Sequence, residues 1–431
     1  MNIIIKFINP SAIIISTLCI IFFALGKIQR KIQLIIMFAF FSFSGLIINI
    51  ITQRNYALLL IYMILVIFIS AYSNWKMIFQ LKNLFIIMLS LYLLHFFIYI
   101  IFNEINLFGY STETGFFSIF LFIMPIIIFF LIKIIFKSKY LKFFISTILF
   151  FLSIICISTI IYCYCSGNLS VEMGPQILGV NPNNFGSLYA SMLIFLIIYK
   201  ERNLKIFPNY LILVLFILAI FLSQSRGAIL AFIITYILYI LMERKKLYYI
   251  ISISIILVII YYTTYYILNL NFFKKTELLI NAYYSRNLII ISSGRIPLWM
   301  SALNFILEGG IFRILFGSGF SSYLNYNVSL YNIPDLQTYA HNHYLHIITQ
   351  SGLVGLILYL TIIIYICKVS FTLAYKIKDL YAKGIFFMMI TYVISDLFGN
   401  RFTGISTFFI WPLIAILFNK NDYYTSRYNK L

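Results

Sequence analysis

Charged residues are scarce in this chain. They make up 10% of its 431 residues, whereas hydrophobic residues make up 63% and the mean hydropathy is +1.01. A water-soluble domain is about half apolar and about a quarter charged. The composition therefore excludes a soluble globular protein, which could not bury so much apolar surface. Many uncharged apolar stretches reach the roughly 18 residues needed to cross about 30 Å of hydrocarbon, so an integral membrane protein is predicted.

Signals of several other protein classes are also missing. The sequence has no Walker motif, no GxGxxG and no Ser-His-Asp signature, so chemistry that uses ATP is not expected and no cofactor is predicted. No internal repeat is visible, which weakens a transporter built from two related halves. Histidines number four, and the five cysteines all fall within or at the ends of apolar runs. Such cysteines are typical of small hydrophobic residues and predict no disulfide framework.

Apolar runs bounded by polar breaks predict an all-α integral membrane protein, because only helices satisfy their own backbone across such runs. The expected fold is a single polytopic membrane domain, residues 1–431, with about 12 or 13 transmembrane helices. The predicted spans are 8–26, 32–51, 56–73, 83–102, 117–136, 143–164, 183–199, 209–225, 227–242, 247–267, 342–367, 384–398 and 404–419.

The net charge of +20 has a plain interpretation in a membrane protein. In a soluble protein it would suggest a nucleic-acid partner, which is not expected here. Alternate loops hold 22 of the 31 lysines and arginines. Because cytoplasmic loops collect basic residues, that side is assigned to the cytoplasm and membrane lipids are the expected surroundings. The other nine basic residues, Arg226 and Arg295 among them, then lie on the external side.

One external loop, residues 268–340, is much longer than the rest. Loops of this length are uncommon unless they are functional. Ser292 and Ser293 followed by Pro297 predict a helix start, and Gly309-Gly310 predicts its end. Leu298, Trp299, Ala302, Leu303 and Ile306 recur at helical spacing, as in an amphipathic helix on a membrane surface. The large loop is therefore expected to be periplasmic, with short surface helices.

Two arginines on this side are candidates for binding an anion. Arg226 divides two apolar runs, in Ser223-Gln224-Ser225-Arg226-Gly227, where a plain turn needs no arginine and a charge near the membrane is costly. Arg295 stands at the start of the predicted surface helix, where backbone N–H groups favour anions. Arginine binds phosphate oxygens in a bidentate manner that lysine cannot reproduce. Together the two predict a clamp for a phosphate or diphosphate.

Three of the four histidines occur in AHNHYLHIITQSGLVG, residues 340–355. His341 lies where the large loop re-enters the predicted membrane, and its ordinary pKa near neutrality makes it a candidate general base. His343, His346 and Gln350 are interpreted first as an interfacial polar patch, with His343 kept as a candidate substrate contact beside Asn342. No HExxH and no cysteine pair completes a zinc site, so no metal is predicted. Gly352 and Gly355 allow close approach of a neighbouring helix.

Weaker candidates complete the set. Asn183, in the turn-forming stretch 179–186 ahead of a predicted span, either lines a polar site or belongs to a simple turn. Asp396 and Arg401 are interpreted as a structural ion pair, and His95 as a packed residue near the outer end of its span.

These motifs, taken in order, resemble the signature of the O-antigen ligase/polymerase superfamily of bacterial envelope glycosyltransferases. His341-Asn342 followed by nine residues and Gly352–Gly355 resembles its histidine motif, and Ser225-Arg226-Gly227 resembles its external arginine motif. The pattern Gly294-Arg295, Trp299, Ala302-Leu303 and Gly317-Ser318-Gly319 resembles its large loop, and residues 181–183 resemble a further family feature. The similarity covers roughly residues 180–360.

The resemblance implies a metal-independent, inverting transferase at the external, periplasmic face of the bacterial plasma membrane. Its donor is a saccharide on undecaprenyl diphosphate. By the same resemblance Arg226 and Arg295 engage the diphosphate and His341 activates the acceptor hydroxyl, while Asn183, Ser225, Asn342 and His343 are candidate substrate-binding residues. A chain-length regulator and a flippase of the same pathway are expected partners.

Three functions remain open on the sequence. A polymerase adds the lipid-linked chain to the next lipid-linked repeat unit. Polymerases of this kind are often rich in Ile, Phe, Tyr and Asn, as this sequence is, and this association favours the polymerase. A ligase moves the finished chain to lipid A-core or another acceptor. A flippase or other transporter for lipid-linked oligosaccharides belongs to another class and predicts internal repeats and mid-membrane charges.

Overall fold

The computed structural model describes residues 84–102, 129, 132–133, 141–165, 182–203, 208–223, 225–243, 295–319, 323, 326, 340–399 and 407–428. Every regular element within these ranges is an α-helix. The helices in chain order are α5 (Leu84–Phe102), α7 (Leu141–Cys165), α8 (Pro182–Asn203), α9 (Pro208–Leu222), α10 (Arg226–Met242), α14 (Arg295–Glu308), α15 (Gly310–Phe316), α17 (His343–Tyr375), α18 (Leu380–Asp396) and α19 (Thr407–Tyr428). The predicted all-α class is thus confirmed for the part of the chain described.

The helix bounds follow the predicted spans closely for α5, α7, α8, α9 and α10. The helix α17 continues to Tyr375, eight residues beyond the predicted end at residue 367, because no proline or glycine interrupts the later sequence. The predicted spans 8–26, 32–51, 56–73 and 247–267 lie outside the described residues, and 117–136 lies almost wholly outside them. The number of spans therefore stays a prediction.

Within the described ranges, α17 alone is long and apolar enough to cross a membrane. A second candidate arises only if α14 and α15, which bend by 120° at Gly309, are counted as one span. The other apolar helices are shorter. The helix predicted to begin after Ser292-Ser293 is present as α14, while its place on the membrane surface stays a prediction, and α15 was not predicted individually.

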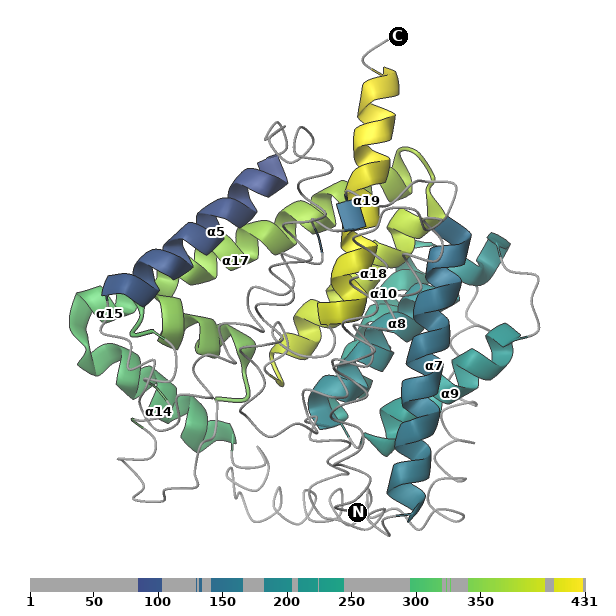
Figure 1. Ribbon diagram of the computed structural model, residues 1–431. Helices are drawn as coiled ribbons and strands as arrows, with labels where there is room; N and C mark the ends of the chain where they lie inside the picture. The colour runs from purple at the N-terminus through teal and green to yellow at the C-terminus, as the bar shows by residue number, and fades with distance from the viewer. Residues whose placement is uncertain are drawn as a thin grey trace, which may run out of the picture.

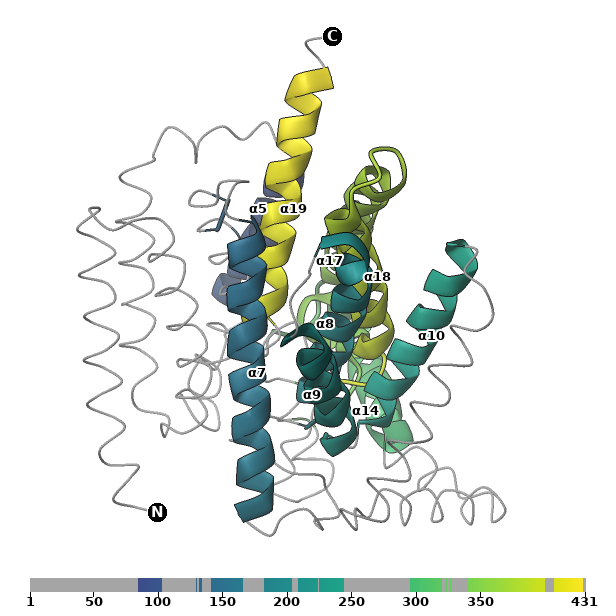
Figure 2. The same cartoon turned by 90° about the vertical axis from the view of Figure 1, so that its right-hand side faces the viewer.

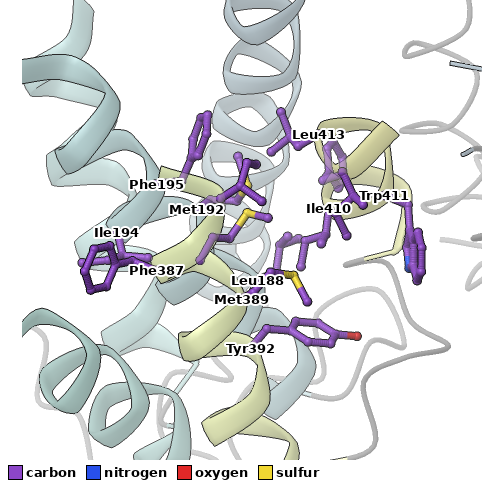
Figure 3. Packing of buried hydrophobic residues seen from close by; sticks show 14 of the residues in the cluster. Leu188, Met192, Ile194, Phe195, Phe387, Met389, Tyr392, Ile410, Trp411 and Leu413 are labelled. Atoms are coloured by element: carbon purple, nitrogen blue, oxygen red, sulfur yellow. The ribbon is translucent and has the colours of Figure 1, made fainter. Parts of the chain in front are cut away.

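The helix α8 forms the centre of the bundle and packs against α9, α10 and α18 (Figures 1 and 2). Leu188, Met192, Ile194 and Phe195 of α8 meet residues of α18 and α19 in a closely packed core (Figure 3). At Gly384 of α18 a β-carbon would lie 2.8 Å from the Phe195 ring. The missing side chain lets α18 approach α8 closely, as small residues do where helices pack in membranes.

The two ends of the bundle differ in their polar groups. Glu243, at the C-terminal end of α10, accepts from Lys383 at 2.8 Å and from the Tyr375 hydroxyl at 3.1 Å. Lys420 of α19 forms an ion pair with Asp379, the N-cap of α18. Arg226 stands at the opposite, N-terminal end of α10. The lysines assigned to the cytoplasm and the arginines assigned to the external side are thus separated by the length of a helix.

Candidate functional site

Arg226, Arg295 and His341 lie far apart in sequence and come together in space. Arg226 is the first residue of α10, Arg295 is the first residue of α14, and His341 lies two residues before α17. Burial lowers the pKa of Arg295, and the Arg226 charge lowers it further. Burial also lowers the pKa of His341, with the Arg295 charge as the second cause. The three groups therefore form one electrostatically coupled cluster, called here the arginine–histidine cluster.

The turn between α9 and α10 presents Arg226. Ser225 is buried and serves as the N-cap of α10, accepting from the Ala228 N–H. The Ser223 hydroxyl donates to the Ile220 carbonyl at 2.6 Å and accepts from the Ser225 N–H at 3.3 Å. These bonds satisfy donors that a helix start leaves open. They fix the backbone at the point from which the Arg226 side chain departs, and a substrate contact for Ser225 stays a prediction.

The first turn of α8, which holds Asn183, lies against this same turn. A β-carbon on Gly186 would lie 2.3 Å from the Ser223 hydroxyl oxygen and 2.9 Å from the Ser225 β-carbon. Only the absence of a side chain at Gly186 permits this approach. Asn183 is thereby placed in the neighbourhood of Ser225, where its carbonyl accepts from the Ser187 hydroxyl at 2.8 Å. Its role as a substrate contact stays a prediction.

Phe398 joins the elements that carry the two arginines. The Arg295 guanidinium lies 6.0 Å from the centre of the Phe398 ring. A β-carbon on Gly227 would lie 2.5 Å from the Phe398 β-carbon, so α10 meets the end of α18 without an intervening side chain. An arginine over an aromatic face is stabilised electrostatically. No short sequence motif marks Phe398, and sequence reasoning missed it.

His341 has an unusual backbone, with φ 49°. Positive φ is uncommon outside glycine, although histidine is among the residues enriched there. The cause lies in the next residue, because Asn342 is the N-cap of α17 and its Oδ1 accepts from the N–H groups of Tyr344 and Leu345. The helix therefore cannot begin earlier, and His341 occupies the turn before it. Such strain often accompanies a functional side chain held in a set direction.

Asn342 thus has a clear structural role through Oδ1, while a substrate contact through its amide nitrogen stays a prediction. Burial and the Arg295 charge lower the pKa of His341 and so favour the neutral imidazole. A neutral imidazole can accept a proton, which an imidazolium cannot. The side chain is thus in the form that a general base requires.

His343 and His346 point into the bundle. Both are buried, and the His343 ring meets Tyr359 edge-on at 5.2 Å between centroids. The Tyr359 hydroxyl donates to the Asp396 carboxylate at 2.6 Å, so these residues share a buried polar region between α17 and α18. His343 and His346 therefore lie in the protein interior, where an interfacial polar patch was expected. A substrate contact for His343 stays a prediction. Asp396 was predicted to pair with Arg401, which lies outside the described residues.

Among the described residues, no group of three or more His, Cys, Asp or Glu side chains could hold a metal ion. The predicted independence from metals is not tested by this finding. Positive charge in the arginine–histidine cluster comes from the two guanidiniums, which carry fixed charge in proteins. Such a cluster is suited to bind an anion with at least two accepting oxygens.

The helix α17 is broken at Gly352, whose φ is 64° and ψ −167°. The break leaves helix carbonyls without their usual partners. The segment after α15 supplies new ones, since Ser318 N–H donates to the Thr349 carbonyl at 3.0 Å and Gly319 N–H donates to the Gln350 carbonyl at 2.9 Å. The predicted close approach at Gly352 is made by this segment's backbone and α15.

Helices α14 and α15 form a bent arm that is held in shape by its own contacts. The Arg313 guanidinium donates to the Phe305 carbonyl at 2.7 Å and lies 4.5 Å from the centre of the Phe305 ring. Ala302, Phe305 and Ile306 pack in one cluster with Ala340, the residue before His341. The arm therefore carries Arg295 at one end, contacts the chain beside His341, and joins α17 at Gly352 through its other end.

In the comparison with protein families, residues 211–360 fit the model of the family described as O-antigen ligase. The resemblance inferred from the motifs is thus confirmed. The matched range contains Arg226, Arg295, His341 and Gly352, and it excludes Asn183, His95 and Phe398. A comparison with curated proteins finds no match.

Proposed function

We propose that this chain, which carries the O-antigen ligase family domain at residues 211–360, is a polymerase of a bacterial surface polysaccharide. It transfers a glycan from undecaprenyl diphosphate to the next lipid-linked repeat unit, at the external face of the plasma membrane. The family match supports action on lipid-linked sugars in general. The observation that carries the proposal is the convergence of Arg226, Arg295 and His341, which belong to three separate helices or their starts.

The proposed reaction is a single displacement. The acceptor hydroxyl oxygen attacks the anomeric carbon of the donor sugar, and the bond from that carbon to the diphosphate oxygen breaks with inversion. His341 takes the hydroxyl proton, and undecaprenyl diphosphate leaves with the bonding electron pair. Arg226 and Arg295 hold the negative charge that grows on the leaving diphosphate. Charge stabilisation by fixed donors is commonly the largest contribution to such catalysis.

The charges of the two arginines and the pKa of His341 support the proposed division into diphosphate-binding arginines and a histidine base. Arg226 and Arg295 repel one another in this structure, since each positive charge disfavours the other. A bound diphosphate, with negative charge on both phosphates, would relieve that repulsion. Its arrival would also offset the Arg295 charge that lowers the pKa of His341. The bound donor would then make His341 a stronger base when it is needed.

A membrane location is part of the proposal. Large apolar side chains on the outward faces of several helices are exposed, among them Leu94, Phe150, Leu211, Leu241 and Ile364. Contiguous apolar faces of this kind are unusual in soluble monomers. They are suited to contact lipid tails, which supports a multi-pass protein of the plasma membrane.

A ligase is the second candidate, because the matched family carries that description. The two functions differ only in the acceptor. The test is to purify the protein in detergent and supply undecaprenyl-diphosphate-linked repeat units from the host's own pathway as the only substrate. A ladder of lengthened glycans, absent in His341→Ala, supports the polymerase. No ladder but transfer to added lipid A-core would identify a ligase, and no transfer to either would contradict both and favour a transporter.

A further inference from the structure

His95 lies in α5, well before residues 211–360 that match the family model. It reaches the break in α17 from the N-terminal part of the chain. Its Nε2 atom is 3.4 Å from the Ser351 carbonyl oxygen, and its ring centroid is 6.3 Å from that of Phe316, the last residue of α15. A carbonyl oxygen only accepts, so the imidazole must carry its proton on Nε2 in this contact. His95 therefore touches both sides of the joint between the arm and α17.

The break at Gly352 exposes three successive carbonyls, and each meets a donor. Thr349 and Gln350 accept from the backbone N–H groups of Ser318 and Gly319. Ser351 is the third, and its contact is with the His95 side chain. Two of the donors are backbone groups that almost any residue provides, whereas the third depends on the residue at position 95. A buried carbonyl left without a donor is destabilising, so the third donor matters to the geometry of the break.

The joint links the two halves of the arginine–histidine cluster. The arm begins at Arg295 and ends at Phe316. The segment directly after it, Gly317–Gly319, donates hydrogen bonds to the α17 carbonyls that the break leaves open. The part of α17 that precedes the break begins directly after His341 and Asn342. A change in the break therefore alters where Arg295 stands relative to His341. Figure 1 shows α15 beside one end of α5 and beside the bend in α17.

We propose that His95 is a positioning residue for the transfer reaction. By donating to the Ser351 carbonyl it holds the break in α17, and the break sets the distance between Arg295 and His341. This inference rests on the proposed function for its effect on rate, but its effect on geometry does not. His95 itself contacts neither donor nor acceptor.

The test compares three variants of the full-length protein. His95→Leu substitutes an apolar side chain of similar volume and removes the donor. His95→Gln keeps an N–H donor at about the position of Nε2 and serves as the conservative rescue. Leu91→Ala changes an exposed residue of the same helix, one turn away, and is the matched control.

The first readout is a distance and needs no substrate. Spin labels are placed at Leu307 of α14 and Ile357 of α17, both of which are exposed, in a background without the five native cysteines. His95→Leu is expected to shift or broaden the distance distribution. His95→Gln and Leu91→Ala are expected to retain the distribution of the parent protein.

The second readout is the transfer rate at saturating donor. His95→Leu is expected to lower kcat by about 10- to 100-fold, the cost of misplacing reacting groups by about 1 Å, while His95→Gln recovers most of it. An unchanged distance distribution and unchanged kcat in His95→Leu would overturn the inference and leave the proposed function intact. If the parent protein transfers no glycan, the proposed function fails, and the distances alone decide the role of His95. Should His95→Leu not fold, His95→Asn, which is too short to reach Ser351, replaces it.

Discussion

Gly317 and Gly352 bring two backbones into direct contact. A β-carbon on Gly317 would lie 2.4 Å from the Gln350 carbonyl carbon, and one on Gly352 would lie 2.3 Å from the Leu315 carbonyl carbon. Both glycines have positive φ, 77° and 64°. Glycine alone tolerates this backbone without strain and leaves space for the approach. The joint that places the arm against α17 therefore depends on both residues.

Gly352→Ala is expected to disable the protein. The variant meets a backbone conformation that is open essentially to glycine alone, at a cost of about 1–3 kcal/mol, and a clash whose relief costs about 1–3 kcal/mol more. Gly310→Ala is the matched control, because Gly310 has φ 66° and nothing lies within 4 Å of its added β-carbon. Thermal unfolding in detergent and transfer rate are measured for both. Equal behaviour of the two variants would show that contact at the joint has no part in the effect.

The pH dependence of kcat/KM is expected to show an acid limb set by His341. The neutral imidazole is the active form, so activity falls as pH drops through the pKa of His341. Burial and the Arg295 charge lower this pKa from its ordinary value of about 6.5, and the limb therefore lies below that value. In Arg295→Gln the charge is gone, so the pKa of His341 rises. The acid limb of the residual activity should therefore lie at higher pH than in the parent protein. A limb that stays in place would contradict the coupling.

Replacing the two arginines by lysine separates charge from geometry. Arg226→Lys and Arg295→Lys keep the positive charge but lose the bidentate fork that matches phosphate oxygens. Removing one fixed donor at a site of developing charge typically costs about 10²- to 10³-fold in kcat. We expect each lysine variant to fall measurably below the parent and each alanine variant to fall further. Lysine variants with full activity would mean that charge alone is sufficient.

Changes at Gly227 and Phe398 should lower activity by less together than the sum of their separate effects. Gly227→Ala places a β-carbon 2.5 Å from that of Phe398, so Phe398 must shift from its position beside Arg295. Phe398→Gly removes the β-carbon and the ring, and with the ring its contact with the guanidinium. In the double variant the clash is gone, so its loss of activity should be smaller than the sum of the two single losses. Contacting residues commonly couple by about 0.5–3 kcal/mol, and strictly additive losses would exclude the contact.

Much of the fold and site could be predicted because the relevant signals are local. Helical spacing and Gly309-Gly310 predicted α14, and the polar break at Ser223–Gly227 predicted where α10 begins. The functional interest of Arg226, Arg295 and His341 followed from placing charged and titratable groups at the ends of apolar runs. The structure adds that these three residues share one electrostatic environment, which no spacing rule could establish.

The remaining features depend on contacts between distant segments. The kink at Gly352 is visible only when the arm that fills it is in place, and an apolar run with two glycines predicts a continuous helix equally well. Phe398 and His95 have no motif around them, and their importance comes from what they touch. The short helix α15 was missed because its seven residues are too few for periodicity to be distinguished from a turn.

The most direct test of the central claim is single-turnover transfer by His341→Ala with donor at saturation, alongside binding of undecaprenyl diphosphate. A general base contributes about 10²- to 10⁴-fold, so the rate should fall by that amount while undecaprenyl diphosphate still binds, since both arginines remain. Arg226→Ala and Arg295→Ala should instead weaken that binding. A folded His341→Ala protein that transfers glycan at the parent rate would contradict the assignment of the base and, with it, the catalytic role of the arginine–histidine cluster.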